Sequence, residues 1–397
     1  MNSVSIYFPA GDFVDVLRRY DEGLPQKYQT HNEVARLIHD LRAANQHVNV
    51  YSFVTPERHE VRLDDGSRVV SLGARDFSVK SLLRATVAAD NVDAIVVHFP
   101  NTELLRAATT TMSRVVAVLA SSYNRTGIRS TLMKRRIVSL LNDPRVELVS
   151  NHCLPATEHL ARLGVRREKL IAWDVSHPVE PSLYQPKKLA VGRCFEVVYA
   201  GSITEDKGIA DLIRAIALLR GRGIEVHCSL AGLGEIDAMQ ALGARLGVSD
   251  LLSFLRLVDN PQVLNMMARA DIVVVPSRAN YPEGFPLSMF EAIASRTPIV
   301  CSDHPMFRDV MVDGRSASVF SAGDYRAFAA AIWRTLTNPG LYSALSMNAP
   351  LTWAALQGPA DWRTMIFKWV VEGDNSPWIR NRMLMAAKPT SGRFTTN

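Results

Sequence analysis

Short runs of β-branched and aromatic residues alternate with longer amphipathic stretches along most of the chain. The strand-like runs are residues 3–8, 48–53, 92–99, 114–120, 146–151, 195–200, 226–231, 270–277 and 298–303. Between the first two runs, apolar residues recur at helical spacing: Val34, Leu37, Ile38 and Leu41. Strands that alternate with helices usually pair in parallel, so this pattern predicts an α/β protein built from doubly wound, Rossmann-like sheets.

A proline-rich segment, HPVEPSLYQPKK at 177–188, lies near the middle of the chain. Its composition is typical of an interdomain linker, which predicts a first domain at 1–187 and a second at 188–365. The stretch from Pro9 to about Thr30 is rich in charge and is expected to be a long loop. It contains no G-x-G-x-x-G, which argues against a dinucleotide fingerprint.

Composition and charge narrow the class of protein only slightly. The net charge of +6 and the pI of about 9.2 suit an acidic nucleotide, an anionic membrane surface or nucleic acid. No run approaches the roughly 18 apolar residues of a membrane-spanning helix. The first residues show no secretory signal, and four scattered cysteines show neither metal-ligand spacing nor a disulfide framework. A cytoplasmic location is therefore expected.

The most informative stretch is 276–298, PSRANYPEGFPLSMFEAIASRTP, between two β-branched runs. It predicts a strand–loop–helix–strand unit, with a helix of about three turns. Open α/β sheets bind ligands at such places. The loop carries Glu283 and the helix carries Glu291. Backbone N–H groups at a helix start favour a phosphate, and a carboxylate suits the hydroxyls of a sugar or ribose. Phosphate plus polyol describes a nucleotide sugar.

The run EGFPLSMFE resembles the E-x7-E signature of retaining glycosyltransferases of family 4, which have the two-domain GT-B fold. The resemblance implies two Rossmann-like domains facing a cleft and a last helix, within 366–397, that crosses back to the first domain before a polar tail. It also implies that Glu283 faces the donor sugar and Glu291 binds the ribose. The intervening donor-binding residues would be Gly284, Phe285, Pro286 and Leu287.

A second donor-site element is expected in the turn after the strand 195–200, which begins at Gly201. It resembles the family's G-R-(x)n-K-G element, whose Arg and Lys hold the donor diphosphate. Lys207 and Gly208 match, whereas Ser202 stands in the arginine place. Arg256 stands where the family mostly has glycine, so it is either a second cation near the nucleotide or a surface residue. Arg278 is another candidate for the missing cation.

The first domain departs further from the family pattern. The family often has a histidine near the reacting sugar where this chain has Ala120. His98, at the end of another strand, is either a substitute contact or a histidine bonded to backbone. The family's Gly-Gly pair near the first helix is missing, which leaves Gly11 as a weak candidate on the acceptor side.

A basic run from Arg125 to Arg136 contains no acidic residue. It is either a solvated basic face or an acceptor-side patch that touches anionic lipid or a lipid diphosphate.

The resemblance implies a retaining hexosyltransferase that moves a sugar from a nucleotide-diphosphate donor to an acceptor hydroxyl, in bacterial polysaccharide or glycolipid assembly. Catalysis would rest on Lys207 and Glu283. No D-x-D occurs, so no metal or other cofactor is expected. The expected partners are the donor and a glycan or lipid-linked acceptor, with loose contact to an anionic membrane and no nucleic acid. The alternatives are a non-catalytic nucleotide-binding scaffold, favoured by Ser202 and Ala120, and a sugar-nucleotide epimerase of the same fold.

Overall fold

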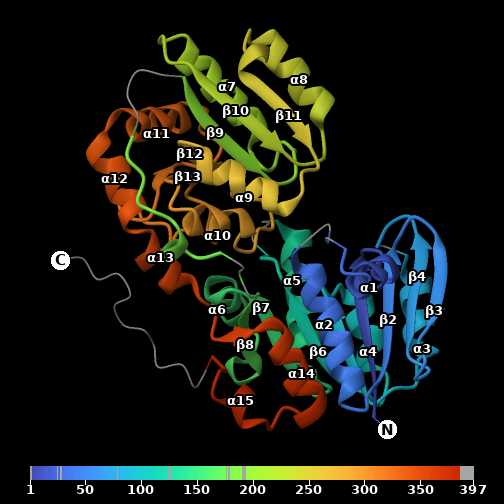
Figure 1. The fold of residues 1–397 in the computed structure, drawn as a ribbon. Helices are drawn as coiled ribbons and strands as arrows, with labels where there is room; N and C mark the ends of the chain where they lie inside the picture. Colours follow the sequence, from blue (N-terminus) through green and yellow to red (C-terminus); the bar gives the residue numbers. More distant parts are fainter. Residues whose placement is uncertain are drawn as a thin grey trace. The chain divides into compact units, whose positions relative to one another are not determined.

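The computed structural model describes residues 2–24, 26, 29–77, 79–123, 127–175, 177, 179–189 and 194–384. These residues form two compact units (Figure 1). Unit 1 contains the chain up to 175 together with 358–384, and unit 2 contains 177–357. Unit 2 thus begins at 177 rather than 188, and the chain returns to unit 1 at 358. The expected polar tail lies outside the described residues, as does Arg125.

In the described part of unit 1, nine strands form one sheet in the order β15-β8-β7-β6-β5-β1-β2-β4-β3. All neighbours pair in parallel except β3 and β4, which form an antiparallel hairpin. The order reverses at β1 and β5, the position where doubly wound sheets bind ligands. The strands are β1 (Ser3–Ala10), β2 (His47–Val54), β3 (Arg58–Arg62), β4 (Arg68–Ala74), β5 (Ala94–His98), β6 (Arg114–Leu119), β7 (Val146–His152), β8 (Leu170–Asp174) and β15 (Ala360–Asp361).

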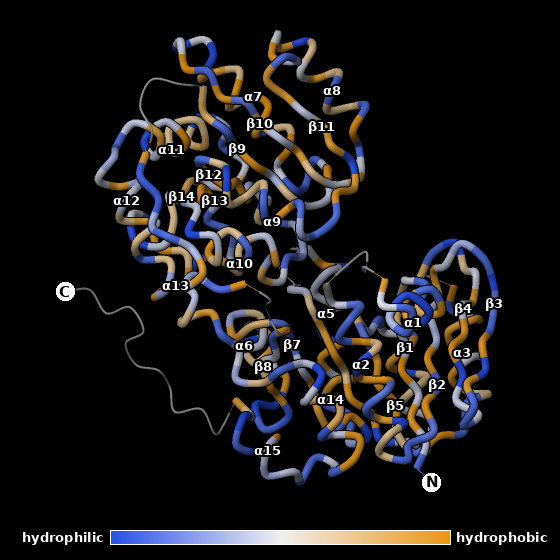
Figure 2. The backbone as a smooth tube through the Cα atoms, viewed as in Figure 1, coloured by the Kyte–Doolittle hydropathy of each residue, from blue (hydrophilic) through white to orange (hydrophobic). Residues whose placement is uncertain are grey.

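Both faces of this sheet are covered, because successive residues of a strand point to opposite sides. Ile6 packs into one hydrophobic core and its neighbour Tyr7 into the other. The labelled strands β1, β2 and β5 are accordingly rich in hydrophobic residues (Figure 2). The helices of unit 1 are α1 (Phe13–Asp21), α2 (Gln29–Ala43), α3 (Lys80–Ala88), α4 (Thr102–Thr109), α5 (Ile128–Leu141), α6 (Leu154–Leu163), α14 (Trp362–Glu372) and α15 (Pro377–Arg380), with a 3-10 turn at Arg167–Lys169.

The prediction of a long loop from Pro9 to about Thr30 is wrong for Phe13–Asp21, because these residues form helix α1. The side chain of Asp12 caps this helix by accepting a hydrogen bond from the Asp15 N–H. Phe13, Val16 and Leu17 then form one buried face, at the i, i+3, i+4 spacing of an amphipathic helix. Burial of these three apolar side chains stabilises the helix although the segment is rich in charged residues.

Unit 2 holds a parallel sheet whose six described strands run in the order β11-β10-β9-β12-β13-β14. The order reverses between β9 and β12, as in the Rossmann arrangement. The strands are β9 (Phe195–Ala200), β10 (Val226–Ala231), β11 (Leu252–Arg256), β12 (Ile272–Val275), β13 (Ile299–Ser302) and β14 (Ser318–Phe320). The helices are α7 (Ile209–Arg220), α8 (Ile236–Arg245), α9 (Asn260–Arg269), α10 (Leu287–Ala294), α11 (Tyr325–Thr337), α12 (Pro339–Met347) and α13 (Ala349–Leu356), with 3-10 turns at Pro181–Leu183 and Ser249–Leu251.

The strand–loop–helix–strand unit expected around Glu283 is confirmed as β12, a loop, α10 and β13. At eight residues, α10 is shorter than the three turns expected. Of the helices described here, none combines the length and apolarity that a bilayer crossing requires.

Candidate functional site

Three glycines let the loops at the carboxyl ends of the unit 2 strands pack against one another. A Cβ on Gly232 would lie 1.8 Å from the carbonyl oxygen of Gly201, and one on Gly208 would lie 2.1 Å from that of Pro276. A Cβ on Gly234 would lie 2.3 Å from the carbonyl oxygen of Ile203. Such approaches exclude any side chain, so the loop after β9 is held between the loops after β10 and β12.

This packing brings Lys207 and Glu283 together at the switch point between β9 and β12. Lys207 Nζ lies 2.5 Å from Glu283 Oε1, and Ser277 Oγ donates to the same oxygen at 2.6 Å. Nζ also lies 4.5 Å from the centre of the Tyr281 ring, a cation–π distance. The side chains of Lys207 and Glu283 are 14% and 7% exposed. A buried carboxylate is thus neutralised by one lysine beside the glycine-rich turn.

Buried side chains fix the loop that carries Glu283. His304 Nε2 lies 3.0 Å from the Tyr281 carbonyl oxygen, and its Nδ1 accepts the Met306 N–H at 3.2 Å. The neutral tautomer with hydrogen on Nε2 satisfies both contacts, and burial lowers the His304 pKa, which favours that neutral form. Ser302 Oγ donates to the carbonyl oxygen of Ser277 at 2.6 Å. The loop that carries Glu283 is therefore fixed by side chains at the end of β13 and just after it, as well as by its own connection to β12.

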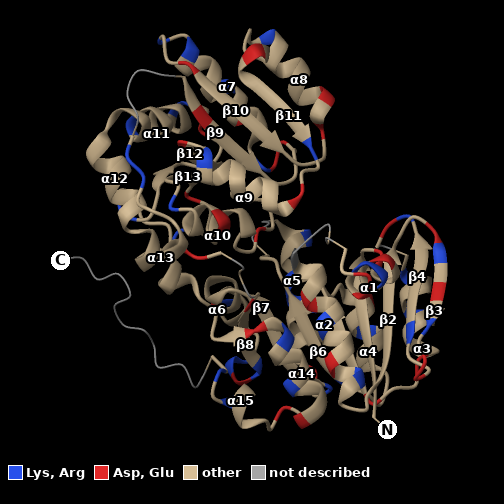
Figure 3. Cartoon of the chain, in the orientation of Figure 1, with Lys and Arg blue, Asp and Glu red and all other residues tan. Residues whose placement is uncertain are grey.

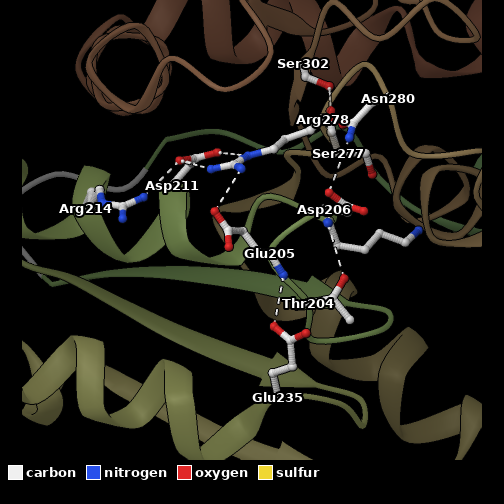
Figure 4. A network of polar contacts seen from close by, with 11 residues as sticks. Thr204, Glu205, Asp206, Asp211, Arg214, Glu235, Ser277, Arg278, Asn280 and Ser302 are labelled. Carbon is white, nitrogen blue, oxygen red and sulfur yellow. Dashed lines mark hydrogen bonds and ion pairs between the residues drawn. The ribbon is translucent and has the colours of Figure 1, made fainter. Parts of the chain in front are cut away.

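Arg278 does not offer a free charge to a ligand, because carboxylates surround it (Figure 4). Its Nε and second terminal nitrogen bind the two Asp211 oxygens at 2.9 and 3.1 Å, and its other terminal nitrogen lies 3.0 Å from Glu205 Oε1. These hydrogen bonds and charges raise the Arg278 pKa. The residue ties the loop after β12 to α7.

Glu291 lies on α10 in a different environment from Glu283. Its Oε1 accepts a hydrogen bond from Asn260 Nδ2, at the start of α9, at 2.6 Å. Burial raises the Glu291 pKa to about 7, while Asn260 and the nearby His177 act in the opposite direction. The His177 ring stacks on Phe290 at 4.5 Å. Glu291 therefore changes charge near neutral pH.

The residues between the two glutamates differ in what they offer a ligand. Gly284 and Phe285 are buried, and the Phe285 ring packs edge-on against Phe290 at 5.2 Å. Pro286 precedes α10 without a side-chain cap, and Leu287 opens the helix, 37% exposed. Of these four residues, Leu287 alone has an exposed side chain.

Ser202 and Arg256 lie at the same edge of the unit 2 sheet. Ser202 is exposed, and its carbonyl oxygen accepts the Tyr199 hydroxyl at 2.7 Å. Arg256 ends β11 with an exposed side chain and a left-handed backbone, φ +56°. That conformation favours glycine, the residue expected here by resemblance. The Arg256 carbonyl accepts the Gly232 N–H at 2.7 Å, which places its backbone beside the glycine contacts.

In unit 1, the candidate residue His98 is the last residue of β5, and Gly11 and Ala120 directly follow β1 and β6. His98 is 4% exposed and stacks on Phe8 at 4.2 Å, and burial lowers its pKa to about 3. Gly11 has φ +115° and its N–H donates to the Val54 carbonyl at 3.3 Å. Ala120 packs against the hydrophobic core. An uncharged, aromatic environment thus surrounds His98.

Sequence reasoning missed Asn260, Ser277, Tyr281 and His304 as parts of the site. Asn260 and His304 lie outside the quoted signature, so only the fold brings them to it. Ser277 and Tyr281 lie within residues 276–298. Their position directly after a predicted strand could have identified them, because ligands bind at the carboxyl ends of such strands. Within the described ranges, no three His, Cys, Asp or Glu side chains are grouped as a metal site would require.

Comparison with known proteins agrees with this geometry. Residues 184–352 match the family described as glycosyl transferases group 1. The chain is 30% identical over 199 residues to the lipopolysaccharide core biosynthesis mannosyltransferase LpcC of Rhizobium leguminosarum bv. viciae. That match covers 44% of this chain and 52% of the mannosyltransferase, so it spans about half of the relative's length.

Two solved structures resemble nearly the whole chain. Sucrose-phosphate synthase from Thermosynechococcus elongatus gives a TM-score of 0.67 at 16% identity, over 93% of this chain and 97% of that one. HepE of Anabaena, in complex with UDP and glucose, gives 0.63 at 15% identity, over 94% and 99%. These likenesses show the GT-B fold. Residues 184–352, which are less than half of the chain, are therefore similar to the glycosyl transferases group 1 family.

Proposed function

We propose that the chain transfers a sugar from a nucleotide-diphosphate sugar to a hydroxyl of a glycan or lipid-linked acceptor, with retention of anomeric configuration. The observation that carries the proposal is the buried Lys207–Glu283 pair at the switch point of unit 2. The relatives named above and the UDP bound to HepE support the choice of a nucleotide sugar as donor.

In this proposal, the protein stabilises charge and aligns the substrates rather than forming a covalent bond. Lys207 and the N–H groups at the start of α10 hold the donor diphosphate, without a metal. The diphosphate competes with Glu283 for Lys207, so donor binding frees Glu283 Oε1 to accept a sugar hydroxyl. Glu291 accepts the ribose hydroxyls. The departing phosphate oxygen takes the acceptor proton, so no enzymic nucleophile is needed.

Ligand screening and turnover test this function together. The purified chain should be stabilised against heat by one of the UDP-, GDP- or ADP-sugars, because a ligand that binds the folded state raises apparent stability. That donor should release nucleoside diphosphate, slowly with water and faster with an acceptor. Proton NMR of the new glycosidic bond should show the donor's anomeric configuration, whereas an inverted product would contradict retention.

A nucleotide-binding scaffold is the second candidate, because Ser202 is exposed where the family has arginine. A scaffold would be stabilised by the nucleotide and release no nucleoside diphosphate. An epimerase would instead return an altered sugar nucleotide. We place the activity in the cytoplasm, at the membrane face where lipid-linked acceptors are glycosylated, as part of the same proposal.

A further inference from the structure

A groove on the surface of unit 2 lies between helix α8 and strand β11. Its volume is about 410 Å³, and it is lined by Gln240, Ala241, Ala244, Ser249, Leu252 and Phe254. None of these side chains carries a charge, and four of the six are alanine, leucine or phenylalanine. An uncharged, mostly apolar lining of this kind favours contact with another protein surface over binding of an ion.

Strand β11 forms one end of the unit 2 sheet. Within the described ranges it pairs with β10 alone, so no strand lies along its other side. Residues 251–255, LLSFL, contain neither a charge nor a proline, which are the features that usually prevent an end strand from pairing further. The outer backbone N–H and C=O groups of β11 are therefore suited to pairing with an added strand, whose side chains would pack along the groove.

Helix α8 forms the other wall of the groove and leaves room for a partner. Ala241 and Ala244 are exposed on this helix, and their short side chains allow a close approach. The wall is fixed in place by packing, because a Cβ on Gly243 of α8 would lie only 2.8 Å from Leu252 Cδ1 of β11. A partner would thus meet a preformed surface.

The charges on α8 lie at opposite ends of this surface. Asp237 is in the first turn of the helix and Arg245 is in its last turn, and both are exposed. Neither side chain forms an ion pair with another residue of the described part of the chain. An exposed leucine accompanies each charge: Leu233 precedes α8 and Leu246 directly follows it, 51% and 40% exposed. Figure 3 shows most of β11 in tan, beside the charged positions of α8.

The geometry points to a second copy of this chain as the partner, bound through the same α8–β11 surface about a two-fold axis. The two β11 strands then run antiparallel in one continuous sheet, and the two α8 helices lie antiparallel on one face of it. Asp237 of each protomer is opposite Arg245 of the partner subunit. A parallel arrangement would place acid opposite acid, so charge complementarity selects the antiparallel pair.

Sedimentation equilibrium of the full chain tests the dimer, which goes beyond the proposed function because it requires neither donor nor acceptor. The wild type should show a reversible monomer–dimer equilibrium between about 1 and 100 μM, as expected for an interface near the small end of the standard size. A wild type that stays monomeric over this range would overturn the inference, and so would one that assembles beyond the dimer.

Reversing the charges tests the antiparallel arrangement. Asp237→Arg and Arg245→Asp should each weaken dimerisation by at least about tenfold, because two attractive contacts across the axis become repulsive. The two substitutions together should restore dimerisation to within about threefold of the wild type, since opposite charges face each other again. If the charges acted only on the dipole of α8, the double variant would be the weakest of the three. That result would overturn the arrangement.

A matched pair of variants tests the groove itself. Ala241→Arg places a long charged side chain in the groove and should weaken dimerisation by at least about a hundredfold. Ala85 is exposed on α3 of unit 1, and Ala85→Arg adds the same side chain there. This control should change the dissociation constant less than about twofold. Equal effects of the two substitutions would place the interface elsewhere, and circular dichroism confirms that each variant is folded.

Discussion

Lys207 and Glu283 are 76 residues apart in the sequence, yet their side chains form a 2.5 Å ion pair at the switch point of the unit 2 sheet. The sequence predicted a separate role for each residue: diphosphate binding for Lys207 and sugar binding for Glu283. The contact makes the two roles interdependent, because a ligand that attracts the lysine changes what the carboxylate can bind.

Lys207→Ala should lower turnover by more than roughly ten- to a hundredfold at saturating donor. A charge-assisted hydrogen bond contributes about 1.5–3 kcal/mol, and the diphosphate charge grows as the glycosidic bond breaks. Steady-state rates at limiting and saturating donor measure the effect. The exposed Lys188 provides a control, since Lys188→Ala should leave the rates unchanged. Full activity in Lys207→Ala would place the diphosphate elsewhere.

Double variants should show which residue shares the diphosphate with Lys207. Because Arg278 is held by Asp211 and Glu205, its effect on donor binding should add to that of Lys207→Ala without coupling. Arg256 has an exposed side chain at the same sheet edge, so Lys207→Ala with Arg256→Ala should be non-additive. Donor affinities from calorimetry give both coupling energies. Coupling to Arg278 and not to Arg256 would reverse the assignment.

Glu291→Ala should weaken binding of the free nucleoside diphosphate and of the intact donor alike, because the ribose is present in both. Glu283→Ala should spare the nucleoside diphosphate and reduce turnover, since its contact is with the sugar. Calorimetry with both ligands distinguishes the two glutamates. Equal losses for the bare nucleotide in the two variants would contradict these roles.

The stability of the protein should depend on pH through Glu291. Its pKa rises from the model-peptide value of 4.5 to about 7 in the folded protein. Between these values the folded state holds a proton that the unfolded chain has lost. The free energy of unfolding should therefore fall as pH rises from about 4.5 to about 7, by at most about 3 kcal/mol from this group.

Urea unfolding between about pH 5 and pH 8 measures this contribution. Glu291→Gln, which cannot ionise, should flatten the fall while keeping the size of the side chain and a contact with Asn260. Ribose binding should have the opposite dependence, because a hydroxyl donates more strongly to the ionised carboxylate. A wild-type curve that matches the Gln variant would show that Glu291 is ionised throughout.

Gly208→Ala should destabilise the protein more than Gly223→Ala, although the two backbones are nearly alike. Their φ angles are +77° and +75°, so both substitutions incur the left-handed strain of about 1–2 kcal/mol. The Cβ on Gly208 would meet the Pro276 carbonyl oxygen, whereas that on Gly223 meets nothing within 4 Å. The added cost should be about 1–3 kcal/mol, measured by chemical denaturation. Equal losses of unfolding free energy in the two variants would mean that the loops after β9 and β12 can move apart without cost.

The sequence predicted β9, β10, β12 and β13 of unit 2 because they are continuous apolar runs, as buried parallel strands require, whereas β11 and β14 were not expected. The run 195–200 coincides with β9, and the turn at Gly201 follows it. The pairing of Lys207 with Glu283 followed from the topology, since β9 and β12 flank the switch point. For Lys207 and Glu283, the sequence motifs and the sheet topology therefore indicate the same site.

Other parts of the site depend on contacts that no local pattern reveals. Asn260 reaches Glu291 from the start of α9, and His304 supports the loop from beyond β13. In unit 1, α1 was overlooked because its charged residues hid a short apolar face. The ion pair of Arg136, in the basic run, with Glu103 was equally invisible, because Glu103 lies on another helix, α4.

The hairpin of β3 and β4 also determines how the large sheet ends. β3 is the outermost strand, and its sequence RHEVR is charged or polar at every position except Val61. Exposed strand edges attract other strands, and charged side chains discourage such pairing. The same polarity that keeps β3 out of the core therefore keeps one molecule's sheet from continuing into the next, which protects a concentrated solution of the protein from edge-to-edge aggregation.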